Sequence, residues 1–162
     1  MGGVFPRRVG PRMKRGAAAI AVAAAAALAG CSAPTHPLAG TTWEIVAVYT
    51  DPDIPGDVPL DAAGRAVIVF GRESLTARTG CAPLQAGASI SDSDVQLRGV
   101  TTGKLDSDCA GGSRRLHTQL SEILVPDAEF DLRRYGEDEI TLTARRGHGI
   151  DLNPPTIRLV AQ

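Results

Sequence analysis

The stretch Trp43-Glu44-Ile45-Val46-Ala47-Val48-Tyr49-Thr50 predicts a fold built from β-strands. Side chains at every second position from Trp43 to Tyr49 would share one face of a strand, and valine and isoleucine supply the β-branched content that strands favour. Trp43, the only tryptophan of the chain, could offer a flat surface to a ligand. At the start of a strand, however, a tryptophan is more often an anchor of the core, and we expect that role here.

Seven further segments are short, apolar or alternating, and bounded by glycine, proline or acidic turn residues. They lie at 66–70, 75–78, 87–90, 95–98, 129–133, 139–143 and 156–160. So many half-buried strands favour a barrel or a strongly curved sheet, because such an architecture hides its edge strands.

One helix is expected over about residues 113–125. Ser113 can cap it, Pro126 stops it, and four apolar residues share one face through their i, i+4, i+7 and i+8 spacing: Leu116, Leu120, Ile123 and Leu124. The predicted fold class is therefore α+β and mostly β, a small antiparallel barrel-like domain with one helix.

Two arginines, Arg114 and Arg115, fall in the first turn of this helix, where the helix dipole disfavours cations. Pairing with Asp106 or Asp108 would offset that cost, and we prefer this ion pair to an anion site. His117 has no obvious partner in the sequence and is interpreted as structural or solvated.

Residues 1–30 have the order of a lipoprotein export signal. A positively charged segment precedes an apolar run over 17–30, and the small residues Leu28-Ala29-Gly30 come directly before Cys31. The run is too short and too rich in alanine for a membrane-spanning helix, which needs about 20 strongly apolar residues. We expect cleavage before Cys31 and attachment of two or three fatty acyl chains such as palmitate at this residue.

The leader has two other interpretations. Cys31 could be an ordinary cysteine, and Arg7-Arg8 could belong to a twin-arginine signal, although the residues that follow lack the apolar character such signals need. A compact signal starts at Met13, so we expect translation to begin there; a precursor peptide containing residues 4–12 would exclude this.

Residues 31–37 form a lipidated tether in this interpretation, with two prolines and no apolar periodicity. His36 lies within it and is expected to be solvated. Residues 38–162 then form one domain of roughly 120 residues, which is a common single-domain size.

The charges are distributed unevenly along the chain. Five of the 17 basic residues and none of the 18 acidic residues precede Cys31, so the remainder carries 12 basic residues and a net charge of −6. An acidic domain repels phosphate backbones, which excludes nucleic acid as an expected partner. The expected attachment to the membrane is therefore the N-terminal lipid anchor, at the extracytoplasmic face of the cell membrane.

Once Cys31 is acylated, Cys81 and Cys109 are the remaining thiols of an exported protein. A disulfide between them is the expectation in an oxidising compartment, and closing a loop of about 28 residues stabilises a fold by around 3 kcal/mol. A redox-active pair and a metal site are the alternatives, although the chain has no Cys-x-x-Cys and no pair of histidines beside these cysteines.

The segment 51–65 contains three prolines and the carboxylates of Asp51, Asp53, Asp57 and Asp61. Its prolines exclude a ladder strand, and loops of about 15 residues are often functional. Calcium binding is conceivable, but the spacing lacks the twelve-residue pattern with its glycine and terminal glutamate. We expect a solvated loop and no metal site.

The order of these segments resembles the META domain of HslJ-type envelope lipoproteins over nearly the whole of residues 38–162. The resemblance rests on 38–45, 67–70, Gly80-Cys81, Cys109, the leucines of the helix and 140–142. The family's glycine-cysteine pair is usually followed by asparagine, whereas Ala82-Pro83 follows here. The resemblance implies a small barrel-like fold and an envelope location, and it implies no catalytic residues.

These observations favour a lipid-anchored, non-catalytic envelope protein that binds a protein partner or a small ligand, in a role such as stress tolerance that the resemblance suggests. The alternative is a small-barrel inhibitor of a secreted hydrolase such as lysozyme, docking through its acidic loop. An enzyme is not expected, because Gly-x-Ser-x-Gly is absent and His36, His117 and His148 fall in a tether, a helix and a loop. No cofactor is expected, and the ligand-binding residues stay unassigned.

Overall fold

The computed structural model describes residues 1–3, 36–145 and 152–162. The chain divides into two units, 1–33 and 34–162, and the fold below is that of the second. The predicted signal peptide, most of the tether, Cys31 and His148 lie outside the described residues. None of the helices within the described ranges is long and apolar enough to cross a bilayer.

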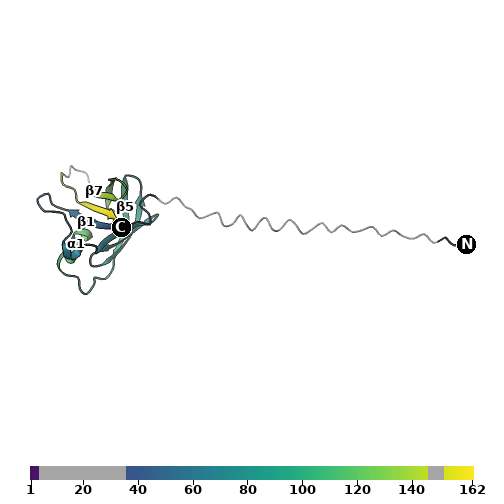
Figure 1. The fold of residues 1–162 in the computed structure, drawn as a ribbon, viewed down its shortest axis with the longest axis horizontal. Helices are drawn as coiled ribbons and strands as arrows, with labels where there is room; N and C mark the ends of the chain where they lie inside the picture. Colours follow the sequence, from purple (N-terminus) through teal and green to yellow (C-terminus); the bar gives the residue numbers. More distant parts are fainter. Residues whose placement is uncertain (4–35, 146–151) are drawn as a thin grey trace. The chain divides into compact units, whose positions relative to one another are not determined.

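Eight antiparallel strands form a closed barrel in which each strand pairs with its neighbours in the sequence and β8 pairs with β1 (Figure 1). The described part of the chain adds one α-helix, α1, and a short 3-10 helix, η2. The predicted class, mostly β with a small antiparallel barrel and one helix, is thus confirmed. The strands are β1 (Thr42–Tyr49), β2 (Ala66–Phe70), β3 (Ser74–Thr79), β4 (Pro83–Ile90), β5 (Asp94–Thr102), β6 (Glu129–Arg134), β7 (Glu139–Arg145) and β8 (Thr156–Ala161).

The connections alternate between the two ends of the barrel, because successive strands of an up-and-down barrel run in opposite directions. The tight turns 71–73, 91–93 and 135–138 lie at the end where the chain enters β1, which we call the tether end. The connections 50–65, 80–82 and 103–128 meet at the opposite end, where β7 ends and β8 begins and which we call the loop end.

Side chains from all eight strands fill the interior as one core cluster. Burial alternates strictly along β2 and β3, as expected for strands with one face inside a barrel. Trp43 is 1% exposed, and its indole Nε1 donates a hydrogen bond to the Leu38 carbonyl at 3.3 Å. Trp43 is therefore a core anchor, as predicted.

The alternation predicted for the first strand is wrong beyond Ile45. A register shift between Ile45 and Ala47 in the pairing with β8 places Val48 in the core and turns Tyr49 outward, where it is 41% exposed. Ala47 lies opposite Arg158 and is buried outside the core cluster, where it is bridged to Asp57. A β-bulge adds one residue to a strand and reverses the faces that follow it. The bulge thus presents an aromatic ring to solvent at the loop end.

His36 is half-buried against the domain and not solvated as predicted. The Leu38 amide donates to His36 Nδ1 at 3.1 Å, and His36 Nε2 lies 3.2 Å from the Gly71 carbonyl. Because Nδ1 accepts, Nε2 carries the proton and donates to Gly71. The ring also meets Phe70 edge-on, with centroids 6.3 Å apart, so the chain is bound to the tether end from His36 onward.

Helix α1 (Gly111–Ile123) begins and ends two residues before the predicted range, and Ser113 is not its cap. The Gly112 amide instead donates a hydrogen bond of 2.8 Å to the carboxylate of Asp61. Asp61 is the middle residue of the short helix η2 (Leu60–Ala62). Ser113 is buried in the first turn, and its Oγ has no hydrogen-bond partner among the described residues. The apolar face of the helix was predicted correctly, and its four residues join the core: Leu116, Leu120, Ile123 and Leu124.

Candidate functional site

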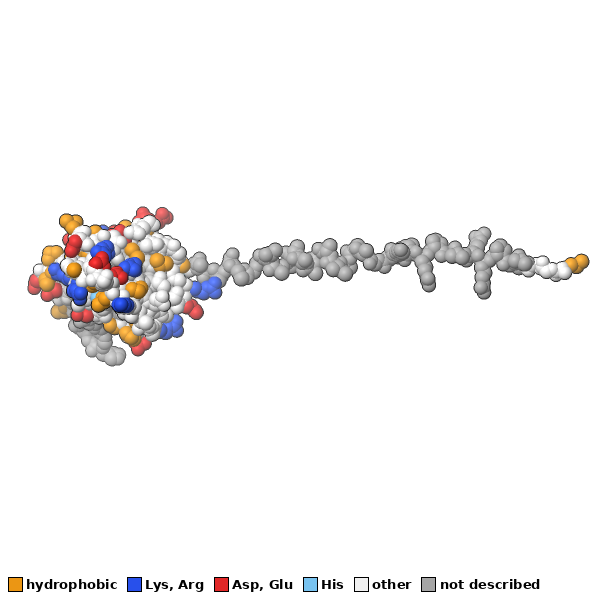
Figure 2. Space-filling model, turned by 90° about the horizontal axis from the view of Figure 1, so that it is seen from below, with side chains coloured by type: hydrophobic (Ala, Val, Ile, Leu, Met, Phe, Trp, Pro, Cys, Tyr) orange, Lys and Arg blue, Asp and Glu red, His pale blue; other side chains and the backbone are white. Residues whose placement is uncertain are grey.

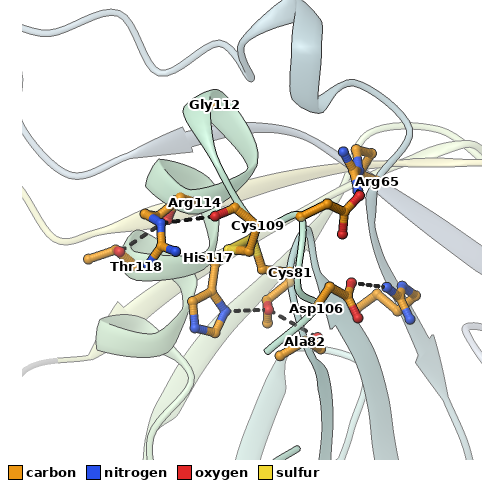
Figure 3. Close-up of a disulfide and its surroundings, with 12 residues drawn as sticks. Arg65, Cys81, Ala82, Asp106, Cys109, Gly112, Arg114, His117 and Thr118 are labelled. Carbon is orange, nitrogen blue, oxygen red and sulfur yellow. Dashed lines mark hydrogen bonds and ion pairs between the residues drawn. A yellow bond between two sulfur atoms is a disulfide. The ribbon is translucent and has the colours of Figure 1, made fainter. Parts of the chain in front are cut away.

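A disulfide joins Cys81, in the turn between β3 and β4, to Cys109, two residues before α1 (Figure 3). Their Cα atoms are 5.3 Å apart, and both residues are buried. The Asp106 amide also donates to the Cys81 carbonyl at 2.8 Å. The expected pair is therefore present, and it fixes the start of the helix to a strand turn at the loop end.

Two ion pairs flank the disulfide, and neither involves Arg114 as predicted. Arg78 Nη2 lies 2.8 Å from Asp106 Oδ2, and Arg65 Nη2 lies 3.6 Å from Asp108 Oδ2. The two aspartates are thus paired with arginines from outside the helix. Because all four side chains are substantially exposed, we assign these pairs only a small contribution to stability.

Arg114 and His117 bond to groups that no sequence pattern indicated (Figure 3). Arg114 Nε donates to the Cys109 carbonyl at 3.1 Å, and His117 Nδ1 lies 2.6 Å from the Thr79 hydroxyl. Thr79 gives its single hydroxyl proton to the Ala82 carbonyl, so His117 Nδ1 is the donor of the other bond. His117 is thus a structural residue that holds the helix to the turn.

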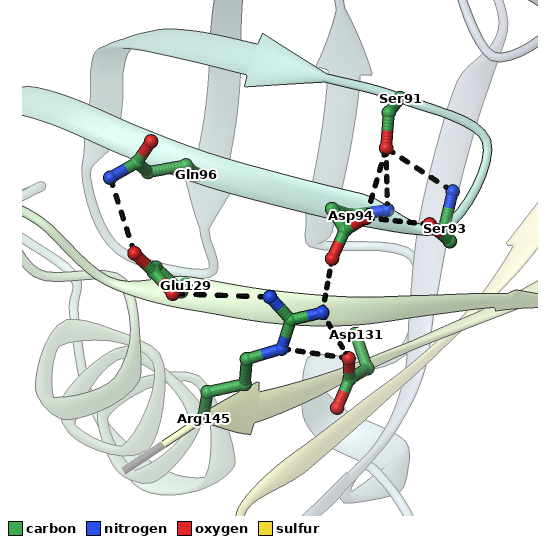
Figure 4. Close-up of polar contacts among 7 residues, drawn as sticks. All are labelled: Ser91, Ser93, Asp94, Gln96, Glu129, Asp131 and Arg145. Carbon is green, nitrogen blue, oxygen red and sulfur yellow. Dashed lines mark hydrogen bonds and ion pairs between the residues drawn. The ribbon is translucent and has the colours of Figure 1, made fainter. Parts of the chain in front are cut away.

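Arg145, at the end of β7, gathers carboxylates from two other strands on the outer face of the barrel (Figure 4). It pairs with Asp94 of β5 and Asp131 of β6, and its Nη1 lies 3.9 Å from Glu129 Oε2. Hydrogen bonds from Ser93 and from Arg145 hold the pKa of Asp94 below its usual value. Hydrogen bonds to Asp131 and to Asp94 raise the pKa of the Arg145 guanidinium. This cluster connects three strands, and its one cation is already surrounded by anions.

The loop end exposes most of the large apolar side chains that are not in the core. Tyr135 is exposed at the tether end. Six other residues of this kind lie at the end of β1 or in the connections of the loop end: Tyr49, Ile54, Leu60, Leu105, Val125 and Leu152. Leu60 is 97% exposed and Leu152 is 82% exposed. Apolar side chains gathered at one end of a small domain are typical of an interaction surface.

Two of these residues, Tyr49 and Ile54, line a groove of about 420 Å³. Its walls come from the end of β1 and the first part of the connection to β2, residues 49–56, together with Asn153 and Pro154 ahead of β8. The acidic loop, which the sequence predicted only as a long solvated loop, thus supplies most of a surface groove.

The carboxylates of the acidic loop have different roles. Asp61 caps α1, and Asp51 Oδ1 accepts a hydrogen bond from the Asp53 amide at 2.9 Å, closing a turn. Asp51, Asp53 and Asp57 are exposed, as expected for a solvated loop. Within the described ranges, no group of three or more histidine, cysteine, aspartate or glutamate side chains is placed to hold a metal ion.

Both charge signs and hydrophobic side chains are interspersed on the face of the domain seen in Figure 2. No continuous basic field covers this view. The groove and the exposed apolar residues make the loop end the candidate functional site.

Comparison with known proteins supports the fold and no further property. No protein-family model matches the sequence, and no curated protein is similar to it. An NMR structure of a protein from Burkholderia xenovorans is similar over 94% of this chain and 98% of its own, with 13% sequence identity and a TM-score of 0.55. A second protein structure solved by NMR covers 78% of this chain and 95% of its own, with 15% identity and a TM-score of 0.52.

Proposed function

We propose that this chain is a lipoprotein of the bacterial cell envelope, anchored through acylated Cys31, whose barrel is a non-catalytic binding module. The leader supports the anchor, because its charged segment, apolar run and small residues before Cys31 follow the order of lipoprotein signals. The META-like order of segments supports an envelope role such as stress tolerance. The ligand is a protein partner or a small molecule bound at the loop end.

The observation that carries the binding role is the contrast between the interior of the barrel and its loop end. Side chains from all eight strands fill the interior, whereas six large apolar residues remain exposed at one end. A barrel that carries a ligand inside needs an unfilled interior. Burial of the exposed residues by a partner would instead contribute about 25 cal/mol for each Å² of apolar surface removed from water.

The proposed anchor also gives the barrel an orientation. His36 is five positions after Cys31, and a fully extended chain spans at most about 3.5 Å per position, or roughly 17 Å. Since His36 is bound to the tether end, that end would face the bilayer. The loop end would then point away from the membrane, toward partners in the extracytoplasmic space.

The test places a photo-crosslinking amino acid at Ile54 of the loop end or, as the matched control, at Tyr135 of the tether end. Both side chains are exposed, at 46% and 56%. We expect a specific crosslinked product from Ile54 in whole cells, and its absence from every loop-end position would contradict the binding role. We also expect Cys31→Ser to abolish labelling with palmitate and to release the protein from the membrane fraction, whereas unchanged labelling would contradict the anchor.

Inhibition of a secreted hydrolase such as lysozyme is the second candidate function. The exposed carboxylates of Asp51, Asp53 and Asp57 lie beside apolar residues of the loop end, and such a surface is complementary to a basic enzyme. Inhibition of a lysozyme at micromolar protein, lost on neutralising these aspartates, would support this function. Full lysozyme activity under those conditions would exclude it for the enzyme tested.

A further inference from the structure

The groove at the loop end is built around the ring of Tyr49. This ring lies over Gly56, which is buried: a Cβ added at Gly56 would fall 2.4 Å from Tyr49 Cδ1 and 2.6 Å from Cε1. No other residue type leaves room for the ring in this position. Tyr49, which is 41% exposed as a whole residue, therefore offers an aromatic surface whose underside is packed.

The backbone around this ring is held in place by the end of β1. The Val48 amide donates to the Gly56 carbonyl at 2.7 Å, and the Val58 amide donates to the Val46 carbonyl at 3.1 Å. An isolated β-bridge also links Ala47 to Asp57. The loop thus folds back on β1 as a short hairpin.

Three prolines stiffen the groove further, Pro52 and Pro55 on the hairpin and Pro154 on the opposite wall. A surface that is already ordered loses little conformational entropy when it binds. The groove is therefore suited to recognition in the conformation that the structure shows.

The charge of the groove is of one sign. Asp51 and Asp53 line it, Asp57 follows directly, and none of the lining residues that the structure describes is lysine or arginine. A cation placed over an aromatic ring and close to carboxylates gains both cation–π and ion-pair interactions. The combination of an exposed tyrosine ring with nearby carboxylates thus favours a cationic group that carries apolar surface.

We propose that this groove binds an arginine or lysine side chain that a protein partner presents between apolar residues. The proposal rests on the binding role of the loop end and names the chemistry of the partner. The aliphatic stem of the cationic side chain would lie against Tyr49 and Pro55, and its charged group would reach Asp51 or Asp53. The neighbouring Ile54 would contact the apolar residues that flank it.

The probe is a fluorescein-labelled peptide with one arginine between two leucines, and its control is the same peptide with citrulline, which keeps the shape and removes the charge. Binding to the full-length protein in neutral detergent is followed by fluorescence anisotropy. We expect the arginine peptide to bind about fivefold or more tightly than the citrulline peptide, as one cation–π contact and one exposed ion pair would give.

Two double variants separate the groove from general electrostatics. Asp51→Asn with Asp53→Asn removes two charges, while the amide oxygen introduced at position 51 can still accept the hydrogen bond that closes the turn. Glu137→Gln with Asp138→Asn removes the same charge from the tether end and is the matched control. We expect the first variant to abolish the preference for arginine over citrulline and the second to preserve it.

A third variant, Tyr49→Ala, should weaken the arginine peptide about fivefold while Tyr49→Phe retains it, because the ring and not the hydroxyl makes the contact. Equal binding of the two peptides, equal losses in both double variants, or no binding of the arginine peptide at millimolar concentration would overturn the proposal. In any of these cases, crosslinking from Ile54 would still report on the binding role, so the two proposals can fail separately.

Discussion

A carboxylate from a distant part of the chain, Asp61, caps α1 in place of the serine within its first turn. The Asp61 side chain accepts from the Gly112 amide, and a Cβ at Gly112 would lie 2.2 Å from Asp61 Oδ1. A glycine is therefore required where the carboxylate approaches the helix. The helix cap was therefore predicted wrongly from the sequence. Ser113 precedes the apolar face as a cap would, whereas Asp61 lies 51 residues before Gly112 in the chain.

Replacing the two residues separately should distinguish these roles. Asp61→Ala removes a helix cap and should lower the free energy of unfolding by about 0.5–2 kcal/mol. Ser113→Ala removes a buried hydroxyl that has no partner among the described residues, and should leave stability unchanged or raise it slightly. Urea denaturation followed by circular dichroism measures both, and a larger loss for Ser113→Ala than for Asp61→Ala would contradict the assignment.

At the scale of elements, the local sequence pattern predicts where the strands lie, whereas their exact ends and bulges depend on the strands with which they pair. Short apolar or alternating segments located every strand, but β4 begins at Pro83 and β5 continues to Thr102, beyond the predicted segments. The bulge in β1 arises from its pairing with β8, more than 100 residues later. The groove could not be predicted for the same reason: it needs the outward turn of Tyr49 and the approach of Pro154 from another connection.

The Arg145 cluster joins β5, β6 and β7, and its effect on stability should depend on pH. The pKa of Asp94 is lowered in the folded state, chiefly by Ser93 and then by Arg145. A lowered pKa contributes stability above the pKa of the unfolded chain, near 3.8, and that stability is lost as pH falls through the folded value. The cluster should therefore stabilise the three-strand junction at neutral pH and not in strong acid.

Arg145→Gln should accordingly raise the pKa of Asp94 without restoring its ordinary value, because the hydrogen bond from Ser93 remains. Carboxyl titration followed by NMR measures this directly. The difference in stability between wild type and Arg145→Gln should be present at pH 7 and shrink below about pH 4. Arg72→Gln, in the turn at the tether end, removes the same charge and is the control; a stability difference that persists unchanged in acid would contradict the assignment.

At the scale of the whole molecule, the disulfide acts through the unfolded chain. Cys81 and Cys109 are 28 residues apart, and the loop that they close contains all of β4 and β5. Closing a loop of this length removes conformational entropy from the unfolded state that corresponds to about 3–4 kcal/mol of stability. Because strand pairing closes the barrel and one core cluster fills it, we expect the reduced protein to fold but to be less stable.

The variant Cys81→Ala with Cys109→Ala should therefore lose about 3 kcal/mol in free energy of unfolding, and dithiothreitol should not reduce its stability further. A released loop also lets the unfolded chain expand and expose more surface, so the urea dependence of the unfolding free energy should become steeper than in the oxidised wild type. Loss of packing around two small buried residues would lower stability without that change in slope. A loss of about 3 kcal/mol in the free energy of unfolding with an unchanged urea dependence would thus place the effect of the cysteines in the folded state and contradict the entropic account.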